Sequence, residues 1–110
     1  MSYGAYKKVV AILRQKCKLA YPVSIRRMEL KNLDGDCCLK DKKFYIRINN
    51  KLNESSAIDT LLHEFAHARA WSHLHDAMNQ NEFQDKIHDA SWGVAYSEVY
   101  QIYEKNFLKY

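Results

Sequence analysis

The pentad His63-Glu64-Phe65-Ala66-His67 constrains the fold of this chain more than any other feature of its sequence. It lies in a stretch, from about residue 56 to residue 79, whose apolar residues recur every three or four positions: Ile58, Leu61, Leu62, Phe65, Ala68 and Trp71. This spacing predicts an amphipathic helix. Residues four apart on a helix project from one face about one turn apart, so we expect His63 and His67 to lie side by side.

Two neighbouring imidazoles of this kind can reach one metal ion, and the pattern H-E-x-x-H within a helix predicts a zinc site. Zinc suits two neutral histidines and a third protein ligand, with the fourth position left to water. Glu64 lies too far round the helix from His63 to coordinate the same ion easily. It is instead expected to accept a proton from the zinc-bound water, as a general base.

Three residues compete for the role of third ligand. His73 lies ten residues after His63, but that spacing needs a glycine to turn the chain at position 70, where Ala70 continues the helix. Glu98 lies in the next predicted helix, where a glutamate ligand would suit the site. His88 opens that same helix and keeps all three ligands histidine, so it is preferred over Glu98 and His73.

The first half of the chain predicts one helix and a small sheet. Apolar spacing indicates a helix from about residue 3 to residue 20. Val23–Leu30 and Phe44–Ile48 have the composition of strands, and Cys38-Leu39 adds a short strand between them. Asp34-Gly35-Asp36 has the composition of a turn. A small antiparallel sheet is therefore expected here.

The second half of the chain predicts two helices. Asn53, Ser55 and Ser56 are candidate caps for the helix of the pentad, and Ser56 with Asp59 fits a capping box. A polar connection over about residues 79–86 leads to a last helix from about residue 88 to residue 108. The order helix, strands, helix, helix predicts an α+β fold, and the length of 110 residues favours one domain over residues 1–110.

Composition narrows the setting of this domain. Seventeen Lys and Arg against thirteen Asp and Glu give a net charge of +4. Most of these cations precede residue 53, and because no aromatic–basic motif accompanies them we assign them to solvated faces. Three cysteines, Cys17, Cys37 and Cys38, are odd in number, which indicates no disulfide framework. No apolar run approaches the ~20 residues that span a bilayer and no secretory segment is visible, so a cytoplasmic location is expected.

Two segments together resemble a known family. The segment Leu61–Ala68, followed some twenty residues later by His88-Asp89-Ala90-Ser91-Trp92, is similar to the SprT-like zinc metallopeptidases. Those proteins carry H-E-x-x-H on one helix and then a histidine that opens the next, in an H-G-x-x-F/W pattern. Asp89 stands here where the family usually has glycine. The resemblance covers roughly residues 42–103, and small stand-alone zincins of this kind are familiar from phages and mobile elements.

The resemblance implies a minimal zincin-like domain that hydrolyses peptide bonds, with His63, His67 and His88 as zinc ligands and Glu64 as the catalytic base. It also implies that a protein or peptide substrate adds as a strand to an edge strand, for which Phe44–Ile48 is the candidate. SprT-like relatives include proteases that act on DNA-bound proteins, so nucleic acid is a conceivable partner.

A non-catalytic zinc-binding interaction module is the alternative. Structural zinc usually fills all four positions with Cys and His, whereas only three ligands are evident in this sequence. Glu64 would also have no purpose in a purely structural site. The enzyme is therefore preferred over the module.

Overall fold

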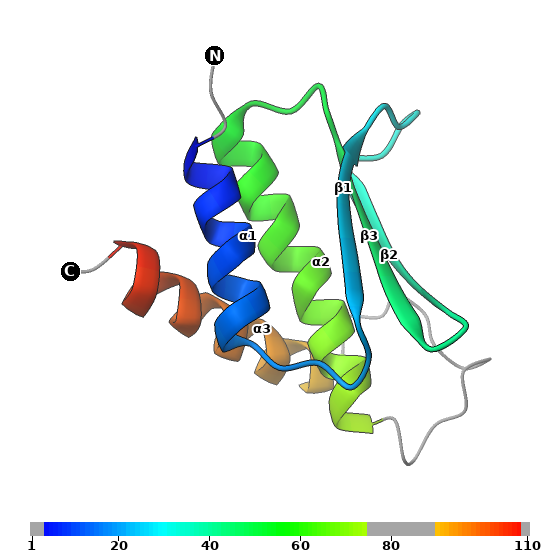
Figure 1. The fold of residues 1–110 in the computed structure, drawn as a ribbon, viewed down its shortest axis with the longest axis vertical. Coiled ribbons are helices and arrows are strands. Elements are labelled where there is room, and N and C mark those ends of the chain that lie inside the picture. The colour runs from blue at the N-terminus through cyan, green and yellow to red at the C-terminus, as the bar shows by residue number, and fades with distance from the viewer. Residues whose placement is uncertain (1–3, 75–89, 109–110) are drawn as a thin grey trace.

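A computed structural model describes residues 4–74 and 90–108 of the chain. The elements are α1 (Gly4–Lys16), β1 (Val23–Met28), β2 (Gly35–Lys40), β3 (Lys43–Asn49), α2 (Glu54–Leu74), α3 (Ala90–Tyr103) and the π-helical segment η2 (Glu104–Leu108). Figure 1 shows α2 between the sheet on one side and α1 on the other, with α3 crossing near the end of α2. The predicted α+β class is confirmed.

The sheet has the order β1-β3-β2, with β3 in the centre. β2 pairs with β3 antiparallel, as expected, but β1 pairs with β3 parallel, so the expectation of an antiparallel sheet was wrong for β1. The cause is the order of the strands: β3 lies between β1 and β2, so Asp34-Gly35-Asp36 does not fold β1 back onto β2. Gly35 and Asp36 already belong to β2.

The tight turn of the sheet lies instead at Asp41-Lys42, between β2 and β3. Both residues have positive φ, 52° at Asp41 and 61° at Lys42. Two residues with positive φ between strands paired at Lys40 and Lys43 make a type I′ hairpin, whose twist matches that of the strands. Lys42 adopts a left-handed backbone conformation, which is sterically unfavourable for residues that have a β-carbon.

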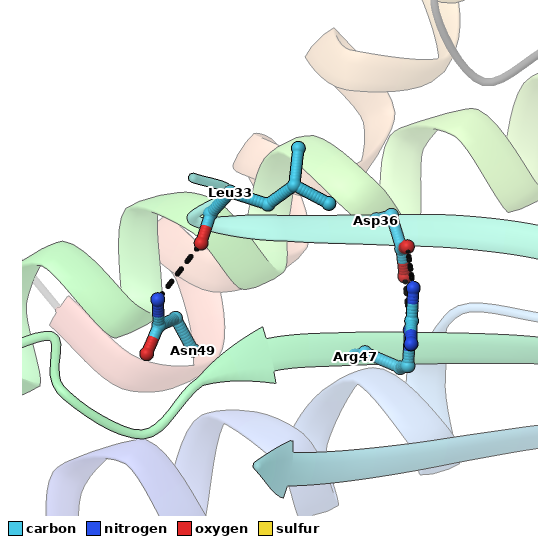
Figure 2. A network of polar contacts seen from close by, with 4 residues as sticks. All are labelled: Leu33, Asp36, Arg47 and Asn49. Carbon is cyan, nitrogen blue, oxygen red and sulfur yellow. Dashed lines mark hydrogen bonds and ion pairs between the residues drawn. The ribbon is translucent and has the colours of Figure 1, made fainter. Parts of the chain in front are cut away.

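Polar contacts hold this sheet in register (Figure 2). Asp36 on β2 and Arg47 on β3 face each other directly and form an ion pair. At the end of β3, the side-chain amide of Asn49 donates to the carbonyl oxygens of Leu33 at 2.8 Å and Leu30 at 3.1 Å. These contacts tie the loop between β1 and β2 to the end of the central strand.

The hydrophobic core lies where α2 meets α1, α3 and the inner face of the sheet. Alternation along β3 buries every second side chain, which places three apolar residues of the central strand against α2. The buried core side chains of the strands and of α1 are Phe44, Ile46, Ile48, Cys37, Tyr6, Val9 and Leu13.

The helix of the pentad begins at Asn53, one of its three candidate caps. Asn53 accepts a hydrogen bond from the backbone N–H of Ser56 at 2.8 Å through its side-chain oxygen, and from Ala57 through its carbonyl. This is N-cap geometry. Ser56 and Asp59 therefore lie inside α2, and the capping box predicted for them is not the start of the helix.

Glu54, the first residue of α2, contacts the start of α1. Its carboxylate oxygen Oε2 accepts hydrogen bonds from the backbone N–H groups of Ala5 at 3.1 Å and Tyr6 at 3.3 Å. Amides in the first turn of a helix have no partner within that helix. Glu54 thus caps α1 from another element and fixes α1 against the beginning of α2.

The three cysteines are unbridged. Cys37 and Cys38 are adjacent on β2, so strand alternation buries the first and exposes the second. The adjacent pair therefore does not present two thiols to one ion. Among the described residues, none of the helices combines the length and apolar character needed to cross a membrane.

Candidate metal centre

His63, Glu64 and His67 occupy consecutive turns in the middle of α2. The two imidazole ring centres lie 5.0 Å apart with their planes at 70°. Glu64 is only 6% exposed and His67 only 3%, while His63 is half-buried. The structure therefore brings the two predicted histidines together. It also buries the carboxylate of Glu64, which lies between them in the sequence.

The spacing of the imidazoles fits zinc. A ring nitrogen binds zinc at about 2.0–2.1 Å, and protein zinc is usually tetrahedral, so two rings on one ion have centres about 5 Å apart. The observed 5.0 Å matches that separation. Nε2 of His67 is shielded from solvent, as a metal-ligating nitrogen would be, and Oε1 of Glu64 is shielded as well.

Trp92 of α3 packs against both imidazoles. Its ring centre lies 5.2 Å from that of His63 and 5.7 Å from that of His67. Tyr96, one turn further along α3, stacks on Trp92 at 5.0 Å with an interplanar angle of 17°. Burial raises the pKa of the Tyr96 hydroxyl, and the negative charge of Asp59 raises it further.

A cavity of about 310 Å³ opens beside the pentad on the side of β2. It is lined by Asp34, Gly35, Asp59, Thr60, His63 and Glu64. Gly35 permits this arrangement, because a β-carbon there would lie 2.7 Å from a methyl carbon of Thr60 and 2.7 Å from the carbonyl oxygen of Arg47. The start of β2 thus approaches α2 closely, and Glu64 forms part of the wall of the cavity.

The favoured third ligand, His88, lies outside the described residues, as does His75. His73 lies in the last turn of α2, but its side chain is not described. Within residues 4–74 and 90–108, no three His, Cys, Asp or Glu side chains are gathered as a metal site would require. The assignment of His88 stays a prediction.

Glu98, the alternative ligand, forms an ion pair with Arg69. Its carboxylate lies 3.4 Å from the guanidinium of Arg69. Arg69 is two residues after His67, and two residues on a helix span about 200°, so this ion pair lies on another side of α2. Burial raises the pKa of the nearby Cys17 thiol to about 11. The positive charge of Arg69 lowers this pKa and the negative charge of Glu98 raises it.

The prediction that Phe44–Ile48 is an edge strand that receives the substrate was wrong. Phe44–Ile48 belongs to β3, which has β1 on one side and β2 on the other, so its backbone groups are already paired. An added strand needs an edge. β2 is an edge strand that packs on α2 and begins at the cavity beside Glu64.

Sequence reasoning missed two features of the site. Asp59 lies four residues before His63, so helical spacing alone could have placed its carboxylate on the same face. The H-G-x-x-F/W pattern of the resemblance includes Trp92 but does not say what its side chain contacts. Its contact with two particular imidazoles depends on how α3 and α2 pack together.

A helix that carries H-E-x-x-H with its glutamate buried, packed on a small sheet, has the layout of a zincin-like domain. The family model described as the SprT-like family matches residues 6–107, and the chain therefore belongs to the SprT-like family. Neither a search of curated proteins nor a search of solved structures found a match.

Proposed function

We propose that this protein is a zinc-dependent metallopeptidase in which His63, His67 and His88 hold the metal and Glu64 is the general base. The observation that carries the proposal is the pair of imidazoles at 5.0 Å, a spacing that fits zinc, next to a buried carboxylate that lines a cavity. Zinc, when bound, would polarise the scissile carbonyl and make water more acidic.

Glu64 moves the proton in this proposal. Its carboxylate accepts a proton from the attacking water as the new C–O bond forms, and then gives that proton to the leaving amine nitrogen as the C–N bond breaks. Its burial supports this role, because the carboxylate is shielded from bulk water next to the two histidines. No other carboxylate lies within the pentad.

The substrate would lie along β2. An extended peptide can add to an edge strand through backbone hydrogen bonds, which hold it without regard to most side chains. Because β2 starts at Gly35, a peptide in this position would pass the mouth of the cavity that reaches Glu64. An unfolded protein segment is therefore the expected class of substrate.

The test compares wild type with Glu64→Gln and His88→Ala, with zinc content and cleavage of an unfolded protein measured on the same samples. Glu64→Gln should keep stoichiometric zinc and lose about 10²–10⁴ in cleavage rate, because the amide has nearly the same size but cannot accept the proton. His88→Ala should lose zinc and cleavage together, because only two ligands remain.

Glu98→Gln is the matched control, since Glu98 is a second glutamate near α2 whose carboxylate pairs with Arg69. It should retain both zinc and cleavage. Equal cleavage by wild type and Glu64→Gln would contradict the mechanism. If wild type binds zinc but cleaves no substrate, with single-stranded DNA present or absent, the zinc-binding interaction module replaces the enzyme.

A further inference from the structure

Three aromatic rings meet at the candidate metal centre. The ring centres of His63, His67 and Trp92 form a triangle with sides of 5.0, 5.2 and 5.7 Å. One indole thus contacts both imidazoles. We propose that Trp92 is a positioning residue that holds both histidines in the orientation in which they bind zinc, an inference that rests on the zinc site proposed above.

Orientation of the ligands has a free-energy cost that Trp92 would reduce. An imidazole on a helix surface is free to rotate about two side-chain bonds, and this freedom is lost when the ring binds an ion. A ring that is already fixed by its neighbours binds with a smaller entropic penalty. His67 is fixed by burial, but His63 is half-exposed, so its contact with Trp92 matters most.

Trp92 is itself held in place by its neighbours on α3. Tyr96 stacks on it almost in parallel, and Tyr96 packs in turn against Tyr100 with ring centres 6.0 Å apart. These three residues are spaced four apart, so they form one stripe along the helix. The extensive packing of α3 on α2 fixes that stripe relative to the histidines.

The electronic character of the rings favours the metal-bound state as well. An imidazole that donates to a divalent cation becomes electron-poor, and the face of an indole is the most electron-rich of the aromatic side chains. The contact of Trp92 with each imidazole should therefore strengthen when metal binds. Removal of the indole would then lower zinc affinity more than it lowers the stability of the metal-free fold.

The experiment measures zinc affinity by competition with a chromophoric chelator for wild type, Trp92→Phe and Trp92→Leu. Trp92→Leu keeps an apolar side chain but removes the ring, and we expect zinc to bind 10–100-fold more weakly, about the effect of losing other contacts that orient metal ligands. Trp92→Phe keeps an aromatic face and should recover most of the affinity. Thermal unfolding of the zinc-free proteins reports any loss of fold.

Phe107→Leu is the matched control. Phe107 stacks on Tyr103 at 5.5 Å and 13°, a pair like that of Trp92 and Tyr96 but more than three helical turns further along the same part of the chain. This variant should leave zinc affinity unchanged. If it weakens zinc as much as Trp92→Leu does, the effect belongs to the packing of α3 in general and the proposal is wrong.

Wild-type affinity in Trp92→Leu would overturn the proposal, and tighter binding would mean that the indole obstructs the site. These outcomes are distinct from failure of the proposed function. A protein that binds zinc, loses affinity in Trp92→Leu and cleaves no peptide would keep Trp92 as a positioning residue in a non-catalytic site. A wild type that binds no zinc would refute both proposals.

Discussion

The two tryptophans of this chain occupy environments of opposite character. Trp71 of α2 is 4% exposed and packs against Tyr21 and Phe44, with ring centres 5.6 and 5.9 Å away. We call Tyr21, Phe44 and Trp71 the structural cluster. Trp92 of α3 is half-buried and packs against His63 and His67. These three residues form the site cluster.

The difference lies in the partners and not in the side chain. The structural cluster joins the segment before β1, the central strand and α2, so it unites parts of the chain fifty residues apart. The partners of Trp71 are the phenyl ring of Phe44 and the phenol of Tyr21, which contribute buried apolar area. The partners of Trp92 are two rings that can bind metal. A tryptophan can therefore serve stability in one region and order a site in another.

Trp71→Ala should have the largest effect on stability and sharpen this comparison. Truncation of a buried tryptophan leaves a cavity in the core, and we expect a loss of about 3–5 kcal/mol in the free energy of unfolding. Urea unfolding of zinc-free protein measures that loss. Zinc affinity under conditions where the variant is folded should change less than threefold. A collapse of zinc affinity in the folded variant would show that the clusters are not independent.

Glu54→Ala should have a smaller effect of the same kind. The change removes the carboxylate that caps α1 through Ala5 and Tyr6, which should cost about 0.5–2 kcal/mol of stability, as the loss of helix caps does. Zinc affinity should not change, because Glu54 lies more than two turns before His63. Ser55→Ala, at an exposed neighbouring position, is the control and should be nearly neutral. An equal loss of stability in Glu54→Ala and Ser55→Ala would contradict the capping role of Glu54.

Lys42→Gly should have the smallest effect and the opposite sign. Lys42 has φ of 61° in the hairpin turn that leads directly into Phe44 of the structural cluster. Glycine adopts this conformation without the steric penalty of a β-carbon. We therefore expect the free energy of unfolding to rise by about 0.5–1 kcal/mol, measured by thermal and urea unfolding. Lys40→Gly, within β2, should instead destabilise. A loss of stability in Lys42→Gly would contradict the assignment of the turn.

The sheet shows where sequence reasoning stops. Asp34-Gly35-Asp36 has the composition of a turn, yet the turn lies at Asp41-Lys42, whose composition is a weaker signal. Gly35 is needed for a different reason, its close approach to Thr60 and to the carbonyl of Arg47. Composition cannot distinguish a glycine that turns the chain from one that lets another element approach. That distinction depends on which segments pack together.

The sequence by itself determined the helix of the pentad and the proximity of His63 and His67, because both follow from the repeat of a single helix. Its cap at Asn53 was also among the candidates, since capping depends on nearest neighbours in the chain. Only the tertiary structure decided that β3 is central, that β2 is the edge beside the cavity and that Trp92 covers both imidazoles. Each of these depends on contacts between distant segments, whose geometry is set by packing and leaves no periodic signal in the sequence.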